Sequence, residues 1–169
     1  MDDDADRRDD FTAWVRSREH ALGRLAYLLT GDRDAAEDLL QNALAKVYRH
    51  WDRVRSADLP DAYVRRVIVN ESNSRWRRLM RRPESPGSHL LEVIDPPAPP
   101  GLDASEALDL WRHVQALPTQ QRAAVVLRYY EDLTEAQTAD VLGCSVGTVK
   151  SHTSRAISAL RTRMSEVSA

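Results

Sequence analysis

The sequence predicts an all-α protein of two small helical domains joined by a proline-rich linker. No stretch of its 169 residues alternates apolar and polar positions between turn dipeptides, as half-buried strands would. Apolar residues recur instead at helical spacing in two blocks, residues 11–82 and 104–165. Six of the eight prolines lie between these blocks, in residues 83–103, which is typical of a linker.

Three helices are expected in the first block. The first runs from Phe11 to Thr30 and ends at Gly31, since glycine commonly stops a helix. Asp32 and Asp34 are candidate caps for the second, whose apolar stripe continues to Trp51. Residues 53–60 are polar and end in proline, so they predict a loop, and a third helix follows over residues 61–79.

Four helices are expected in the second block. The first two cover residues 104–117 and 119–130, separated by Pro118. A short helix over residues 134–142 opens with a capping box, Thr134 paired with Gln137. After a tight turn at residues 143–145, Ser145 is expected to cap a final helix that reaches about Met164.

Charge is strongly segregated although the formal net charge is only −2. Residues 1–10, expected to be an acidic tail, hold six Asp and two Arg, and residues 83–109 hold six acids and no Lys or Arg. In contrast, residues 60–82 hold seven Arg against two acids, and residues 145–163 hold three Arg and one Lys without an acid. Two separate basic segments predict a polyanion bound at two places.

Composition argues against several other classes of protein. No apolar run approaches the ~20 residues that cross a bilayer, so we expect no membrane insertion. The one cysteine, Cys144, excludes an intrachain disulfide and argues against a cysteine-based metal site, and it fits a reducing, cytoplasmic compartment. The five histidines are scattered and no glycine-rich phosphate loop occurs, so we expect no metal, no cofactor, no small-molecule substrate and no enzyme activity.

The segment over residues 133–160 has the pattern of a helix-turn-helix: a short capped helix, a turn containing glycine and a longer second helix. The second helix carries hydroxyls and cations that suit phosphate contacts and hydrogen bonds to base edges in a major groove. The alternative is an ordinary helical hairpin with a solvated polar face. The capping and the absence of acids favour the DNA-binding interpretation.

A second signal is the basic end of the helix over residues 61–79, where arginines mix with Asn70, Asn73, Ser74 and Trp76. Arginine can hold phosphates, Asn and Ser can bond bases, and Trp can stack on them. A cationic helix end also complements the helix dipole without any ligand, so this signal is weaker alone. The acidic residues over residues 32–38 indicate a helix start stabilised by the helix dipole more than a metal site. An acidic patch that binds a basic partner remains the functional alternative.

Three motifs together resemble one known family: DAAEDLLQNAL (34–44), AYVRRVIVNESNSRWRR (62–78) and LPTQQRAAVVLRYYEDLTEAQTADVLGCSVGTVKSHTSRAISALR (117–161). They are similar to the extracytoplasmic-function (ECF) sigma factors of bacterial RNA polymerase, in particular the SigE-like actinobacterial group. The resemblance implies a sigma region 2 domain at residues 11–82 and a region 4 helix-turn-helix domain at residues 104–165. It also implies that the chain binds core RNA polymerase and directs it to promoters, with region 2 reading and melting the −10 element and region 4 reading the −35 element.

The resemblance assigns roles residue by residue. The −35 contacts it implies are Arg128, Thr148, Lys150, Ser151, Ser154 and Arg155. The −10 contacts are Arg66, Asn70, Asn73, Ser74 and Arg77, with a base pocket in the loop over residues 55–60. The contacts to core polymerase are Asp38, Leu39, Gln41 and Asn42, although the family usually has Glu where Asn42 stands.

The implied partners are core RNA polymerase and promoter DNA, and an anti-sigma factor is a further candidate. The implied location is the bacterial cytoplasm, in association with the nucleoid. A proline-rich linker over residues 83–103 would reach about 65 Å. Two turns of duplex span about 70 Å. Two tethered modules could therefore occupy both promoter elements at once.

The main alternative is a helix-turn-helix regulator of the LuxR/NarL type, because TVKSHTSR (148–155) is close to that pattern as well. Such a regulator would bind duplex DNA as a dimer and would need a sensor domain. The N-terminal block is too short for a doubly wound receiver domain, and its apolar residues recur at helical spacing. Both observations disfavour this alternative.

Overall fold

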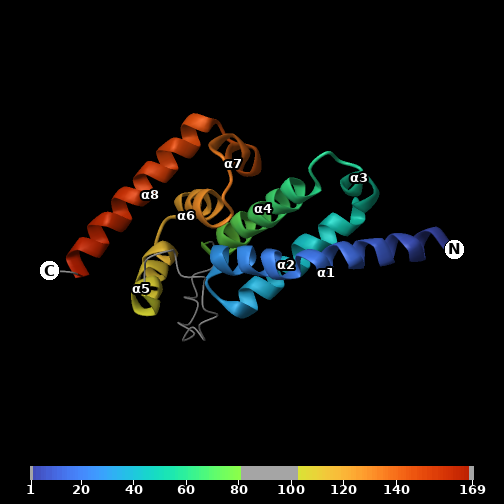
Figure 1. Ribbon diagram of the computed structural model, residues 1–169, viewed down its shortest axis with the longest axis horizontal. Coiled ribbons are helices and arrows are strands. Elements are labelled where there is room, and N and C mark those ends of the chain that lie inside the picture. Colours follow the sequence, from blue (N-terminus) through green and yellow to red (C-terminus); the bar gives the residue numbers. More distant parts are fainter. Residues whose placement is uncertain (1, 81–102, 168–169) are drawn as a thin grey trace.

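The computed structural model describes residues 2–80 and 103–167, and every regular element in these two ranges is a helix, which confirms the all-α fold class (Figure 1). The N-terminal module consists of α1 (Asp2–Thr30), α2 (Arg33–Arg49), α3 (Trp51–Arg55) and α4 (Pro60–Met80). The C-terminal module consists of α5 (Ala104–Gln115), α6 (Thr119–Val125), η1 (Val126–Tyr130), α7 (Glu135–Leu142) and α8 (Val146–Val167).

The turn between α1 and α2 forms as the sequence predicts. Gly31 takes a positive φ of 73°, and its amide donates to the Tyr27 carbonyl at 2.7 Å. The Asp32 side chain then caps α2 by accepting a hydrogen bond from the Ala35 amide at 2.8 Å. The two helices therefore form an antiparallel pair whose apolar stripes share one core.

The expected acidic tail over residues 1–10 is wrong as a separate segment, because α1 is already helical at Asp2. Side chains from its first turns pack on α2 and α3. Arg7 donates to the Tyr48 carbonyl at 2.6 Å, and Asp10 accepts from the indole nitrogen of Trp51 at 2.8 Å. These contacts offset the poor helix propensity of repeated aspartates, which sequence periodicity could not reveal.

The predicted loop over residues 53–60 is shorter in the structure. His50 leaves helical geometry, and α3 begins at once with Trp51 and continues to Arg55. Trp51 and Val54 are buried, which anchors this single helical turn on the core. Only residues 56–59 connect α3 to α4.

The C-terminal module follows its predicted order with two differences. The sequence predicts one helix over residues 119–130, whereas the last five of these residues form the π-helical turn η1. Asp103 and Glu106 form a capping box at the start of α5 that the sequence analysis did not find. The capping box of Thr134 and Gln137 is confirmed, and Ser145 accepts from the Thr148 amide at 3.1 Å at the start of α8.

The two modules pack directly against each other. The α7 helix lies along α4, and α1 contacts α5, α6 and η1. Buried residues of both modules belong to one continuous cluster, in which Tyr27 of α1 stacks on Trp111 of α5 with ring centroids 5.9 Å apart. The expectation of two separately tethered modules therefore does not describe this conformation. The expected linker, except for Asp103, lies outside the described residues.

One buried polar group allows a stability prediction. The Thr138 side chain is fully buried in α7, and its hydroxyl has no hydrogen-bond partner among the residues that the structure describes. We expect Thr138→Val, which keeps the shape and removes the hydroxyl, to raise the free energy of unfolding by about 1 kcal/mol. Urea unfolding followed by circular dichroism measures this free energy. Thr12→Val is the matched control, because the Thr12 hydroxyl is exposed and donates to the Arg8 carbonyl. Equal changes in the free energy of unfolding of the two variants would contradict the expected cost of the buried Thr138 hydroxyl.

Candidate nucleic-acid interface

The α7 and α8 helices form a helix-turn-helix. Gly143, in the turn between them, has a positive φ of 67°, a conformation that glycine adopts without a Cβ penalty. Val149 and Ala156 are fully buried and fix one side of α8 against α6 and α7. Ala136 of α7, in contrast, is exposed. The buried side leaves the opposite side of α8 open to solvent.

The residues expected to read DNA from α8 share that open side. Lys150, Ser151, Ser154 and Arg155 are all exposed; we call them the α8 face. Their spacing places them on adjacent turns of one helix surface. Lys150 lies 3.7 Å from the carboxylate of Glu135, and both side chains are well exposed, so this pair is weak. The α8 face therefore presents cations and hydroxyls that are free to bind an anionic ligand.

Two other expected contacts from this module are engaged within the chain. Arg128, half-buried on η1, donates to the Leu133 carbonyl and so holds the turn that leads into α7. The Thr148 hydroxyl lies 2.9 Å from the Ser145 hydroxyl within the cap of α8. In this conformation both residues position the helix-turn-helix, and neither offers a fully exposed group.

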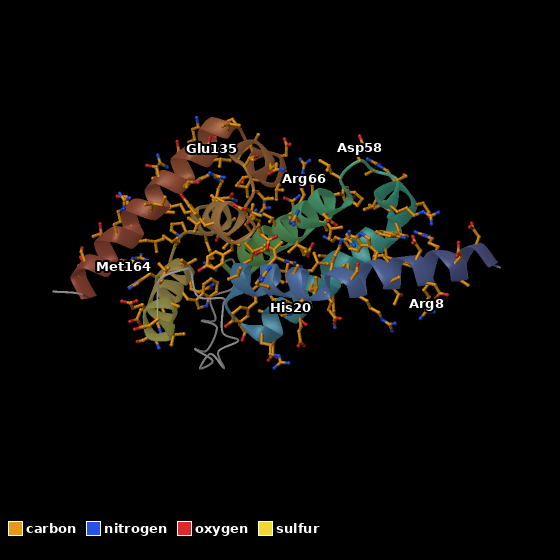
Figure 2. All side chains as sticks on the ribbon, viewed as in Figure 1. Arg8, His20, Asp58, Arg66, Glu135 and Met164 are labelled. Atoms are coloured by element: carbon orange, nitrogen blue, oxygen red, sulfur yellow. The ribbon has the colours of Figure 1, made fainter. Side chains whose placement is uncertain are left out.

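The residues expected at the second site follow one face of α4. Arg66, Asn70 and Arg77 are exposed, while Asn73 and Ser74 between them are half-buried; together we call them the α4 face. Val64, Ile68 and Val69 are fully buried on the other side and orient the helix. Arg81 and Arg82 lie outside the described residues. Figure 2 shows Arg66 on the upper side of α4, between the loop that carries Asp58 and the helices α7 and α8.

An acidic residue within α4 does not weaken this cationic face. Glu71 is buried, its carboxylate bonds the Lys46 ammonium of α2, and its other oxygen lies 3.5 Å from Arg78. Its charge is therefore turned inward and balanced, because a buried carboxylate needs partners. What α4 exposes between Arg66 and Arg78 is basic or neutral, which favours phosphate binding.

A third predicted surface lies on α2. Asp38, Gln41 and Asn42 are exposed on one face, and Asp38 lies 3.7 Å from Arg75 of α4. Leu39 was expected to contact polymerase as well, but its side chain has no exposed surface. Leu39 packs in the core instead, so the surface of α2 predicted to contact polymerase reduces to its three polar residues. Asp38, Gln41 and Asn42 follow the spacing of one helix face.

A cleft lies where the short α3–α4 loop approaches α7. It has a volume of about 340 Å³, and its lining includes Leu59, Asp61 and Arg65 from one module and Gln137 and Val141 from the other. Leu59 is unusually exposed for a leucine, at 69%. The loop expected to form a base pocket is thus at the seam between the modules.

The structure also shows contacts between the modules that the sequence analysis missed. Arg65 of α4 pairs with Glu131 at 3.0 Å, and Gln115 and Arg122 reach across to α1. No regular spacing links such positions, so only the packing of the modules reveals them. Within residues 2–80 and 103–167, no cluster of candidate metal ligands occurs and no helix is long and apolar enough to cross a membrane.

A helix-turn-helix combined with a second exposed basic helix defines a DNA-binding protein of two helical modules. Comparison with protein families places it further: the sigma-70 region 2 model matches residues 14–82, and the sigma-70 region 4 model matches residues 107–160. The RNA polymerase sigma-E factor of Streptomyces coelicolor is 39% identical over 153 residues, covering 90% of this chain and 84% of that protein. The ECF sigma factor SigM of Mycobacterium tuberculosis is 33% identical over 146 residues, covering 86% and 72%.

This chain belongs to the ECF sigma factors, which are promoter-directed initiation factors of RNA polymerase and not enzymes. Among solved structures, the sigma factor RpoE of Bartonella quintana, in complex with the anti-sigma factor NepR, has a TM-score of 0.67 at 24% identity. The match covers 92% of this chain and 97% of the Bartonella chain, which shows a likeness of fold. Because the N-terminal module matches sigma-70 region 2, the LuxR/NarL-type alternative is not favoured.

Proposed function

We propose that this sigma factor reads a promoter with two helices: the α8 face reads the −35 element as duplex, and the α4 face reads and melts the −10 element. In this proposal residues 11–82 act as region 2 and residues 104–165 as region 4, joined by the linker over residues 83–103. Arg128 and Thr148 support the α8 face from within the helix-turn-helix.

The observation that carries the proposal is that the α8 face, and Arg66, Asn70 and Arg77 of the α4 face, are exposed on the segments matched by the two family models. Lys150 and Arg155 can hold phosphates or guanine edges, and Ser151 and Ser154 can bond bases. On α4, arginines flank the amides of Asn70 and Asn73, a combination suited to an unpaired strand. Because each face is small, neither alone would bind a promoter tightly and specifically.

The polymerase supplies the remaining affinity in this proposal. We assign its docking surface to Asp38, Gln41 and Asn42 of α2, with Leu39 supporting them from the core. The location we propose is the bacterial cytoplasm, at the nucleoid. An anti-sigma factor is a further proposed partner, since the structural relative from Bartonella quintana was solved with one.

Run-off transcription tests this function. Core RNA polymerase from the host is mixed with the purified chain and with a library of genomic promoter fragments. We expect specific transcripts that require the chain, whereas the chain without core polymerase should bind the same fragments weakly. The absence of any chain-dependent transcript across the library would refute the proposed function.

A further inference from the structure

The loop over residues 56–59, which joins α3 to α4, is exposed along its whole length. Within it, the Ser56 hydroxyl donates to the carbonyls of Asp52 and Arg53, which belong to the preceding helix α3. The α3 helix has only five residues, too few to be stable alone. The position of the loop therefore depends on what holds its two ends.

The first end of the loop is held by α1 through Asp10. The Asp10 carboxylate accepts a hydrogen bond from the indole nitrogen of Trp51 at 2.8 Å and lies 3.4 Å from the Arg55 guanidinium. Trp51 begins α3 and Arg55 ends it, so one carboxylate contacts both ends of this short helix. The rings of Phe11 and Trp14 pack on Trp51, with centroids 5.1 and 5.4 Å away. These contacts together fix the last residue before the loop.

The second end of the loop is held by the same helix through Arg18. The Arg18 guanidinium donates to the carboxylate of Asp61, the second residue of α4, at 2.5 Å. Arg18 also lies over the Trp14 ring, 4.6 Å from its centroid, and donates to the Ser17 hydroxyl at 2.8 Å. Both charged groups are partly exposed, so their pairing adds little to the free energy of unfolding. It does fix where α4 starts relative to α1.

Asp10 and Arg18, which we call the α1 clamp, lie on one continuous helix. They are eight residues apart, which corresponds to about 12 Å along the helix axis. Figure 1 shows α1 passing α3 and α4, and it contacts both. At the far end of the loop, the Leu59 carbonyl accepts from the Tyr63 amide at 3.3 Å, so Leu59 follows the start of α4. A single rigid helix therefore sets the distance between the two ends of the loop.

We propose that Asp10 and Arg18 are positioning residues for promoter reading, because they hold the loop over residues 56–59 in the shape that accepts a base of the unpaired −10 strand. This inference rests on the proposed function. It extends the reading of the −10 element to α1, where Asp10 precedes the segment that the region 2 model matches. The exposed Leu59 side chain is suited to apolar contact with a thymine methyl group.

The clamp acts on specificity because a recognition site must be held within about 0.5 Å by the residues that support it. Releasing either end of the loop lets Leu59 move relative to the α4 face. Discrimination among −10 bases then falls, while the −35 contacts stay unchanged because α8 belongs to the other module.

The experiment uses the full chain with core polymerase and a promoter library randomised over the −10 element, whose transcripts are counted by sequencing. The test variants are Arg18→Gln and Asp10→Ala. Arg16→Gln and Asp9→Ala are the matched controls, because both residues are exposed neighbours on α1. Asp61→Asn, alone and combined with Arg18→Gln, tests whether Arg18 acts through Asp61. Circular dichroism checks that each variant is folded.

We expect Arg18→Gln and Asp10→Ala each to lower the preference for the best −10 sequence over its single-base variants about fivefold, the lower end of what one base contact contributes. Fivefold corresponds to about 1 kcal/mol. The −35 preference, core binding and the controls should be unchanged, and the double variant should lose no more than either single variant. An equal fall in transcription from all −10 sequences, or additive losses in the double variant, would overturn the inference.

Hydrogen exchange tests the clamp without a promoter. Mass spectrometry of the free chain measures exchange of the amides over residues 51–63, and we expect faster exchange in Arg18→Gln and Asp10→Ala than in the controls. Unchanged exchange would overturn the clamp. Absence of chain-dependent transcripts from the unmodified chain would instead refute the proposed function, and the exchange rates would still report on the clamp.

Discussion

Replacing Arg155 by alanine is expected to reduce transcription from a promoter with an intact −35 element by about tenfold or more. Arg155 is exposed on the α8 face beside Ser151 and Ser154, where a guanidinium can bond a guanine edge or a phosphate. A good bidentate contact of this kind contributes about 1–3 kcal/mol of discrimination. The measurement is run-off transcription on paired templates with and without the −35 sequence.

The variant should lose its preference for the −35 sequence and keep its binding to core polymerase, because the α2 surface is on the other module. Arg8→Ala is the matched control, since Arg8 is also exposed but lies near the start of α1. Loss of core binding by Arg155→Ala in a pull-down would contradict the assignment. Unchanged discrimination between the two templates would contradict it equally.

The second large effect concerns stability at the seam. Trp111→Ala should lower the free energy of unfolding by about 3–5 kcal/mol, the usual cost of removing a large buried aromatic side chain. Trp111 is 1% exposed, stacks on Tyr27 and meets Tyr130 edge-on with ring centroids 6.3 Å apart. Such a loss is a large share of the stability of an ordinary domain. Equilibrium urea unfolding measures the free energy of unfolding of the variant.

Trp111→Phe is the control, because it keeps an aromatic ring for Tyr27 and removes an indole N–H that has no hydrogen-bond partner within residues 2–80 and 103–167. We expect it to cost much less than the alanine change. If Trp111→Ala costs below about 1 kcal/mol, Trp111 is largely exposed in solution, and the packing of α5 against α1 does not represent the free protein.

Local chemistry made most of the helices predictable. Gly31 and Gly143 stop helices where the sequence places them, and Asp32, Thr134 and Ser145 start them with side-chain caps. Each of these signals acts within four residues, so a single sequence contains it. The exposed polar faces of α4 and α8 were predictable for the same reason, since helical spacing determines which residues share a surface.

The remaining features depend on contacts between distant residues. The first turns of α1 form because Arg7 and Asp10 reach Tyr48 and Trp51, some 40 residues away. Gln115 and Arg122 reach the carbonyls of Leu28 and Leu29 across even longer separations. Leu39 was expected at a polymerase contact from a motif alone, yet its place on the inner stripe of α2 buries it. Motif resemblance indicates a role for a segment, and packing decides which side chains can perform it.

The most direct test of the account measures how one chain binds one promoter with and without core polymerase. A promoter found by run-off transcription is compared with a version whose −10 and −35 elements are moved apart by half a helical turn, using fluorescence anisotropy. We expect tight specific binding only with core polymerase, and we expect this binding to be lost when the two elements face opposite sides of the duplex. Equally tight and specific binding by the chain alone, insensitive to the spacing, would contradict it.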